Sequence, residues 1–145
     1  MEENKSFVEI NTKPEEKVMP DLSNAESDAV AECIHSVLYD KKGRNIKTVK
    51  VEDKTIIADY FVLCSGTSKN KVRSLADILV DKMKEAGVRA TRVEGANDPR
   101  SEWVAVDFGS VIVHIFTREM RDFYNLDRLY GESGEIYTLI SDNEN

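Results

Sequence analysis

The most constraining feature of the sequence is a pair of apolar runs, WVAVDF and VIVHIF, separated by the dipeptide Gly109-Ser110. A two-residue connection with glycine first is typical of a type II′ turn, so the pattern predicts a β-hairpin. Strict alternation of side chains then gives the hairpin one entirely apolar face, which must lie in a core. That face consists of Val104, Val106, Phe108, Val111, Val113 and Ile115.

The opposite face of the hairpin carries Trp103, Asp107, His114 and Phe116. His114 is diagonal to both Asp107 and Trp103, at roughly 7–8 Å between backbones, which long side chains can span. Three interpretations are open. A helix covers this face and His114 is a core histidine whose partner is Asp107; the face belongs to a docking surface for another protein; or Asp107 and His114 form a catalytic pair, for which the sequence signals no nucleophile.

The docking interpretation draws on the segment that follows the hairpin. Residues 103–130 hold six of the eleven aromatic side chains, a concentration that a core does not require. Tryptophan, tyrosine and arginine are the usual anchors of protein interfaces. The segment places four further candidates close to the hairpin, namely Arg121, Tyr124, Arg128 and Tyr130.

Helices and strands are expected in alternation along the rest of the chain. Ser23 or Asn24 can cap a first helix, whose apolar positions fall at helical spacing. Strands follow over 46–51, where apolar and polar residues alternate, and over 59–66, which is almost continuously apolar. The apolar positions of the first helix are Val30, Ile34, Val37 and Leu38.

The second half of the chain predicts a long helix that Ser68 caps and Gly87 ends. A strand with polar alternation over 88–95 is expected near a sheet edge, and a single short helix over 118–131 follows the hairpin. The element order is α-β-β-α-β-β-β-α. It predicts an α/β fold: one domain in which a mixed five-stranded sheet is flanked by helices.

Charge and composition divide the chain into three parts. Residues 1–24 carry a net charge of −3 and predict a disordered polar leader, residues 131–145 carry −4 and form an acidic tail, and the domain over 25–130 is neutral. A neutral domain does not favour direct or sequence-specific nucleic-acid binding. The sequence has no run of eighteen apolar residues and no signal peptide, so we expect a cytoplasmic protein without a membrane segment.

Two cysteines, Cys33 and Cys64, lie far apart in the sequence and form no metal-ligand or redox spacing. We expect two buried, reduced thiols and neither a metal nor a cofactor. The Gly66-Thr67-Ser68 turn between a strand and a helix keeps a second function open, that of a nucleotidyltransferase-like nucleotide-binding domain or enzyme. Such an enzyme needs two carboxylates on the next strand, and 88–95 offers only Glu94, at its end.

Three stretches, DYFVLCSGTSKNKV, WVAVDFGSVIVHIF and RDFYNLDRLY, together resemble the RsfS/Iojap family of bacterial ribosomal silencing factors over about residues 25–130. The family pattern usually ends in Leu-Trp, where this chain has Leu129-Tyr130. The resemblance implies a nucleotidyltransferase-like fold without the catalytic carboxylates, and no enzymatic activity.

The resemblance also implies a partner and a way of acting. Members of the family bind the large ribosomal subunit through ribosomal protein number fourteen at the intersubunit face. They block joining of the small subunit, and so repress translation. It implies frequent homodimers as well. The residues expected to contact the partner are Trp103, Asp107, His114, Phe116, Arg121, Tyr124, Leu129 and Tyr130.

Overall fold

The computed structural model describes residues 18–131. Their elements follow the expected order, except that two helices instead of one follow β5 within the described range. The elements are α1 (Ser27–Asp40), β1 (Arg44–Lys50), β2 (Tyr60–Gly66), α2 (Lys69–Glu85), β3 (Arg92–Glu94), β4 (Trp103–Asp107), β5 (Val111–Thr117), α3 (Arg118–Tyr124) and α4 (Leu126–Gly131).

The five described strands form one mixed sheet in the order β1-β2-β5-β4-β3, which confirms the predicted fold class. Strands β2 and β5 pair in parallel, and the other neighbours are antiparallel. The β4–β5 hairpin has the predicted register, with Trp103 opposite Phe116. A φ of 95° at Gly109, with no positive φ at Ser110, fits the type II′ turn.

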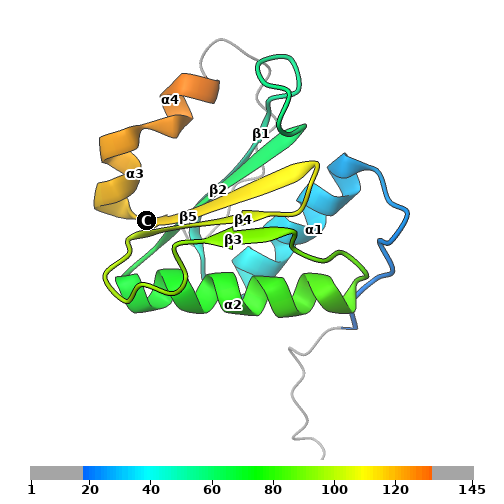
Figure 1. Cartoon of the computed structure of the whole chain (residues 1–145), viewed down its shortest axis with the longest axis horizontal. Coiled ribbons are helices and arrows are strands. Elements are labelled where there is room, and N and C mark those ends of the chain that lie inside the picture. The colour runs from blue at the N-terminus through cyan, green and yellow to red at the C-terminus, as the bar shows by residue number, and fades with distance from the viewer. Residues whose placement is uncertain (1–17, 132–145) are drawn as a thin grey trace, which may run out of the picture.

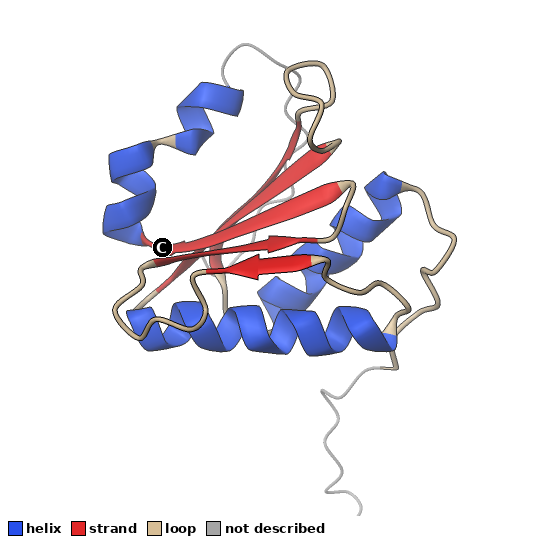
Figure 2. Cartoon of the chain, viewed as in Figure 1, coloured by secondary structure: helices blue, strands red, loops and turns tan. Residues whose placement is uncertain are grey.

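The sheet separates two unequal layers, as Figures 1 and 2 show. Helices α1 and α2 cover one face, and the apolar face of the hairpin lies in the main core beneath them. On the other face, α3 and α4 form a two-helix arm, residues 118–131, at one side of the sheet. A smaller core containing Phe61, Leu63 and Phe116 lies on the arm's side.

The prediction of a single helix over 118–131 is wrong, because the structure has two helices there. Asn125 adopts a left-handed conformation, with φ of 53° and ψ of 49°, and its N–H donates to the Arg121 carbonyl at 2.8 Å. This geometry ends α3, because asparagine tolerates the left-handed region better than most residues. A new helix, α4, starts at Leu126 in a different direction (Figure 1).

The first helix also begins later than expected. Its N-cap is Glu26, which makes no side-chain capping bond, and Ser23 instead bonds to Asp21. Met19 and Leu22 pack against the main core, and the Leu22 N–H donates to the Ala86 carbonyl at 2.7 Å. Met19 and Leu22, which fall within the expected leader over 1–24, thus contact the domain. Residues 1–17 of that leader and residues 132–145 of the expected acidic tail over 131–145 lie outside the described residues.

Candidate docking surface

Aromatic side chains cluster on the sheet face beside the arm. The Trp103 ring lies 5.4 Å from the Phe116 ring and 4.8 Å from the Tyr124 ring, between centroids. His114 lies 4.9 Å from Phe61 in an edge-on arrangement. The hairpin supplies Trp103, His114 and Phe116 through strict alternation, and α3 supplies Tyr124, so the cluster joins the sheet to the arm.

His114 is held by Trp103 and not by Asp107, as one interpretation had expected. The Trp103 Nε1–H donates to His114 Nδ1 at 3.1 Å, while Asp107 Oδ1 accepts from the Gly109 N–H at 2.7 Å in the hairpin turn. The Asp107–His114 pair is therefore absent. With Nδ1 as an acceptor, the neutral imidazole carries its proton on Nε2, which is buried without a hydrogen-bond partner. Burial lowers the pKa of His114 from 6.5 to about 4.

Arg121, an expected partner contact, faces the protein interior and is only 8% exposed. Its guanidinium donates to both carboxylate oxygens of Asp127, at 3.0 and 2.9 Å, to the Asn45 carbonyl at 2.7 Å and to Ser65 Oγ at 2.9 Å. Because these acceptors engage Nε, Nη1 and Nη2, little of the guanidinium is left for a partner. Arg121 is an internal link between arm and sheet.

Asp127 completes this link from the arm's side. Lys47 Nζ approaches Asp127 Oδ2 at 3.1 Å, so the carboxylate lies between two cations. Partial burial acts to raise the pKa of Asp127, but the hydrogen bonds and charge of Arg121, followed by those of Lys47, outweigh it. The pKa of Asp127 falls to about 2, and the carboxylate is ionised at neutral pH.

Exposed apolar side chains lie on the arm and in one loop of the sheet. On the arm, Phe123 is 78% exposed, Tyr124 50% and Leu129 62%. In the loop between β1 and β2, Ile56 and Ile57 are exposed as well, and this loop projects at the same end of the molecule as α4 (Figure 1). We call the set Ile56, Ile57, Trp103, Phe123, Tyr124 and Leu129 the docking surface.

The expected partner residues are thus divided by the structure. Tyr124 and Leu129 are exposed on the arm and Trp103 is half-buried, whereas Phe116 is fully buried and His114 largely so. Asp107 lies at the hairpin turn, and the side chain of Tyr130 is outside the described part of the structure. Phe123, Ile56 and Ile57 are exposed apolar residues that the sequence analysis did not single out. The adjacent isoleucines in the polar connection EDKTIIA were the available signal for the last two.

The turn after β2 is explained by local structure. Ser68 Oγ accepts from the Lys71 N–H at 3.0 Å, which caps α2 as predicted. A side chain at Gly66 would place its Cβ 2.9 Å from Val72, so close helix packing requires the glycine. Within residues 18–131, no group of three or more potential ligand side chains can hold a metal ion.

The two thiols differ in environment. Cys64 is fully buried, and burial raises its pKa to about 12. Cys33 is half-buried, and burial raises its pKa as well. Both are free, and neither thiol is activated, since a reactive cysteine has a lowered pKa. None of the helices in the described range has both the length and the apolar character needed to cross a bilayer.

Fold and surface together define a small α/β domain whose prominent feature is a set of exposed aromatic and aliphatic side chains. The family model described as "Ribosomal silencing factor during starvation" matches residues 24–145. The chain belongs to the ribosomal silencing factor family, RsfS. As a member of this family it is not an enzyme, as expected from the sequence.

Individual relatives agree with the family assignment. The chain is 36% identical over 94 residues to the ribosomal silencing factor RsfS of Bacillus subtilis, which covers 65% of this chain and 78% of that protein. It is 32% identical over 98 residues to a mouse protein named for mitochondrial assembly of the ribosomal large subunit, covering 66% and 42%. A crystal structure from Chromobacterium violaceum matches with a TM-score of 0.70 and 29% identity, covering 81% and 97%.

Proposed function

We propose that the chain binds the large ribosomal subunit through the docking surface, contacts ribosomal protein number fourteen there, and excludes the small subunit. Translation falls because subunits no longer join, and the chain acts in the cytoplasm. Two findings support this proposal. The family description names silencing of ribosomes during starvation, and the name of the mouse relative refers to the ribosomal large subunit.

The observation that carries the proposal is the exposure of the docking surface. Leu129, Phe123 and the two loop isoleucines are exposed, and Phe123 contacts Tyr124, whose ring lies against the half-buried Trp103. Exposed apolar side chains in such number mark interaction sites, and the aromatic members are typical of interface hot spots. The mechanism is steric, because a domain with a radius of gyration of roughly 14–15 Å fills the space between two joining surfaces.

Binding to purified large subunits tests the proposal. We expect Tyr124→Ala to weaken binding by at least about thirtyfold, which corresponds to the loss of a hot-spot contact of about 2 kcal/mol. The matched control is Tyr39→Ala, since Tyr39 is 37% exposed on α1, across the sheet from the arm. The control variant should bind like the wild type and block subunit joining at full strength.

Two further measurements separate the parts of the proposal. Isolated ribosomal protein number fourteen should bind the wild type and not the Tyr124→Ala variant; binding to whole subunits without binding to this protein would refute the named contact. Sedimentation of the free chain tests the homodimer that the resemblance implied. A dimer that Tyr124→Ala dissociates would show that a second copy covers the same surface in the absence of subunits.

A further inference from the structure

We infer that Arg121 is the positioning residue of the docking surface: its guanidinium fixes the orientation of the arm against the sheet, so that surface residues from both parts face one partner. This inference rests on the proposed function. The docking surface is divided between the sheet, which supplies Trp103, and the arm, which supplies Phe123, Tyr124 and Leu129. Something must hold the two parts in register.

The chain is built so that Asp127 returns to Arg121. Left-handed Asn125 ends α3 one residue after Tyr124 and redirects the backbone into α4. The carboxylate of Asp127 then forms a two-bond fork with the guanidinium, six residues away in sequence. Such a bidentate pair fixes an angle as well as a distance, which a single hydrogen bond does not. It therefore sets the direction of α4 relative to α3.

The other side of the guanidinium is fastened to the sheet. Nη1 donates to the Asn45 carbonyl and to Ser65 Oγ, on strands β1 and β2. The pairing of β1 with β2 shifts register between Arg44 and Lys47, and Asn45 within this bulge has a positive φ of 49°. A bulge re-aims the groups it contains, and here the Asn45 carbonyl points to Arg121. An irregular strand thus supplies the fixed end of the link.

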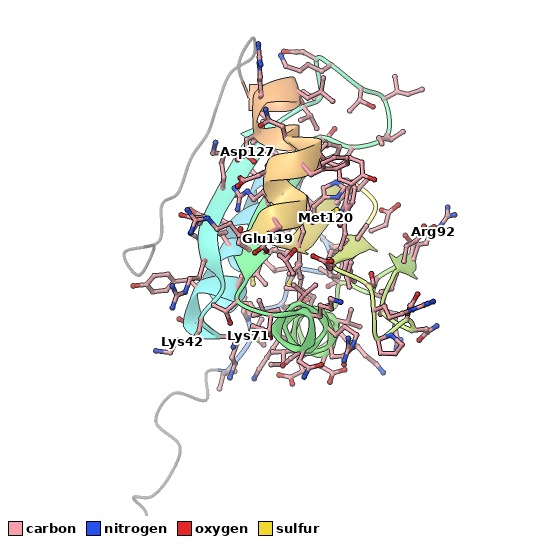
Figure 3. All side chains as sticks on the ribbon, turned by 90° about the vertical axis from the view of Figure 1, so that its left-hand side faces the viewer. Lys42, Lys71, Arg92, Glu119, Met120 and Asp127 are labelled. Atoms are coloured by element: carbon pink, nitrogen blue, oxygen red, sulfur yellow. The ribbon has the colours of Figure 1, made fainter. Side chains whose placement is uncertain are left out.

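Stability alone is a weak account of this network. A partly buried ion pair frequently stabilises no more than apolar residues of the same volume, whereas it can specify one arrangement among several. Lysine cannot replace Arg121, because one ammonium group cannot reach four acceptors in a planar fork. Figure 3 shows Asp127 above Glu119 and Met120 along the arm, so the carboxylate that Arg121 holds lies away from the start of α3. The near end is fixed separately, where Thr117 Oγ1 bonds to Glu102 at 2.8 Å.

The test uses Asp127→Asn, which keeps the shape of the side chain and removes its charge. The matched control is Asp122→Asn, an exposed carboxylate on α3 with the same change in net charge. Hydrogen exchange on the free protein should accelerate at least about tenfold at the Arg128 and Leu129 amides, which donate to the Asn125 carbonyl, and stay unchanged in β5. Large-subunit binding should fall about tenfold or more at equal folded fraction by circular dichroism.

Rescue distinguishes positioning from a merely structural role. Asp127→Glu restores the carboxylate and should recover part of the affinity, while Arg121→Lys should not. Equal binding by the Asp127→Asn and Asp122→Asn variants, or unchanged exchange in α4, overturns the inference. Failure of the wild type to bind large subunits refutes the proposed function instead, and the exchange measurement on the free chain still decides whether Arg121 holds the arm.

Discussion

A neutral imidazole buried in the sheet makes the stability of the fold depend on pH. The pKa of His114 is about 4 in the folded chain and 6.5 for the unperturbed group. As the pH falls below 6.5, the unfolded chain takes up a proton that the folded chain does not, so stability is lost progressively down to about pH 4. The full loss is about 3 kcal/mol for a shift of this size.

Replacing the histidine removes this dependence. We expect the His114→Phe variant to keep nearly the same unfolding free energy between pH 6.5 and 4.5, apart from the slope contributed by carboxylates, while the wild type loses about 2 kcal/mol or more. Urea denaturation at the two pH values measures both. Parallel losses in wild type and variant would mean that His114 is protonated in the folded state.

Alternation along the hairpin was sufficient to place Trp103, His114 and Phe116 on one face. A one-residue error in register would move the whole apolar set from the core face to the opposite face, so only one pairing fits the sequence. It was not sufficient to choose the histidine's partner. Trp103 and Asp107 lie at equivalent diagonal positions relative to His114. The Asp107 carboxylate instead accepts a hydrogen bond from the Gly109 N–H in the tight turn. The burial of Arg121 depends on Asn45, 76 residues away, which no local pattern encodes.

Among the elements, α2 has a cap whose contribution is measurable. Ser68→Ala removes the acceptor of the Lys71 N–H and should cost about 1 kcal/mol of stability. The neighbouring Thr67 is exposed and makes no capping bond in the described structure, so Thr67→Ala is the control, with an effect of a few tenths of a kcal/mol. Both variants should block subunit joining as the wild type does at temperatures where they are folded. Loss of silencing in a folded Ser68→Ala variant would make this turn a functional site.

Helix periodicity predicted α1 and α2 well and misread the arm. In α2 the apolar stripe is long, and glycine ends it at a positive φ of 87°. In the arm, Met120, Phe123 and Leu126 continue a helical spacing across Asn125, so the sequence pattern contains no break. The break depends on Asn125, which ends α3 in the left-handed conformation that asparagine tolerates, and Arg121 pairs with Asp127 across it.

At the scale of the whole molecule, Met19 and Leu22 extend the packing of the domain beyond the start of α1. We expect deletion of residues 1–22 to cost roughly 1–2 kcal/mol more than deletion of residues 1–17, because only the longer deletion removes the partly buried Met19 and Leu22 and the bond from Leu22 to Ala86. Thermal melts of the two truncated chains measure the difference. Equal melting temperatures would show that this segment contributes nothing to the domain.

The sequence predicted the fold class because its signals are local: a hairpin, two capped or periodic helices and a buried strand. The parallel pairing of β2 with β5 joins Tyr60 to Val111, and only tertiary contacts establish it. Exposure of the docking surface was equally beyond local patterns. Phe116 and Tyr124 are both aromatic, yet Phe116 is fully buried and Tyr124 is half-exposed.

Both edges of the sheet are poor templates for adding a strand from another chain. Strand β3 has only three residues, and its outer residues, Arg92 and Glu94, are charged and exposed. Strand β1 has a bulge at one end and carries Lys47 and Lys50. Short, charged or bulged edges are how natural sheets avoid aggregation. The exposed apolar side chains of the arm can thus coexist with a sheet that does not grow into fibrils at high concentration.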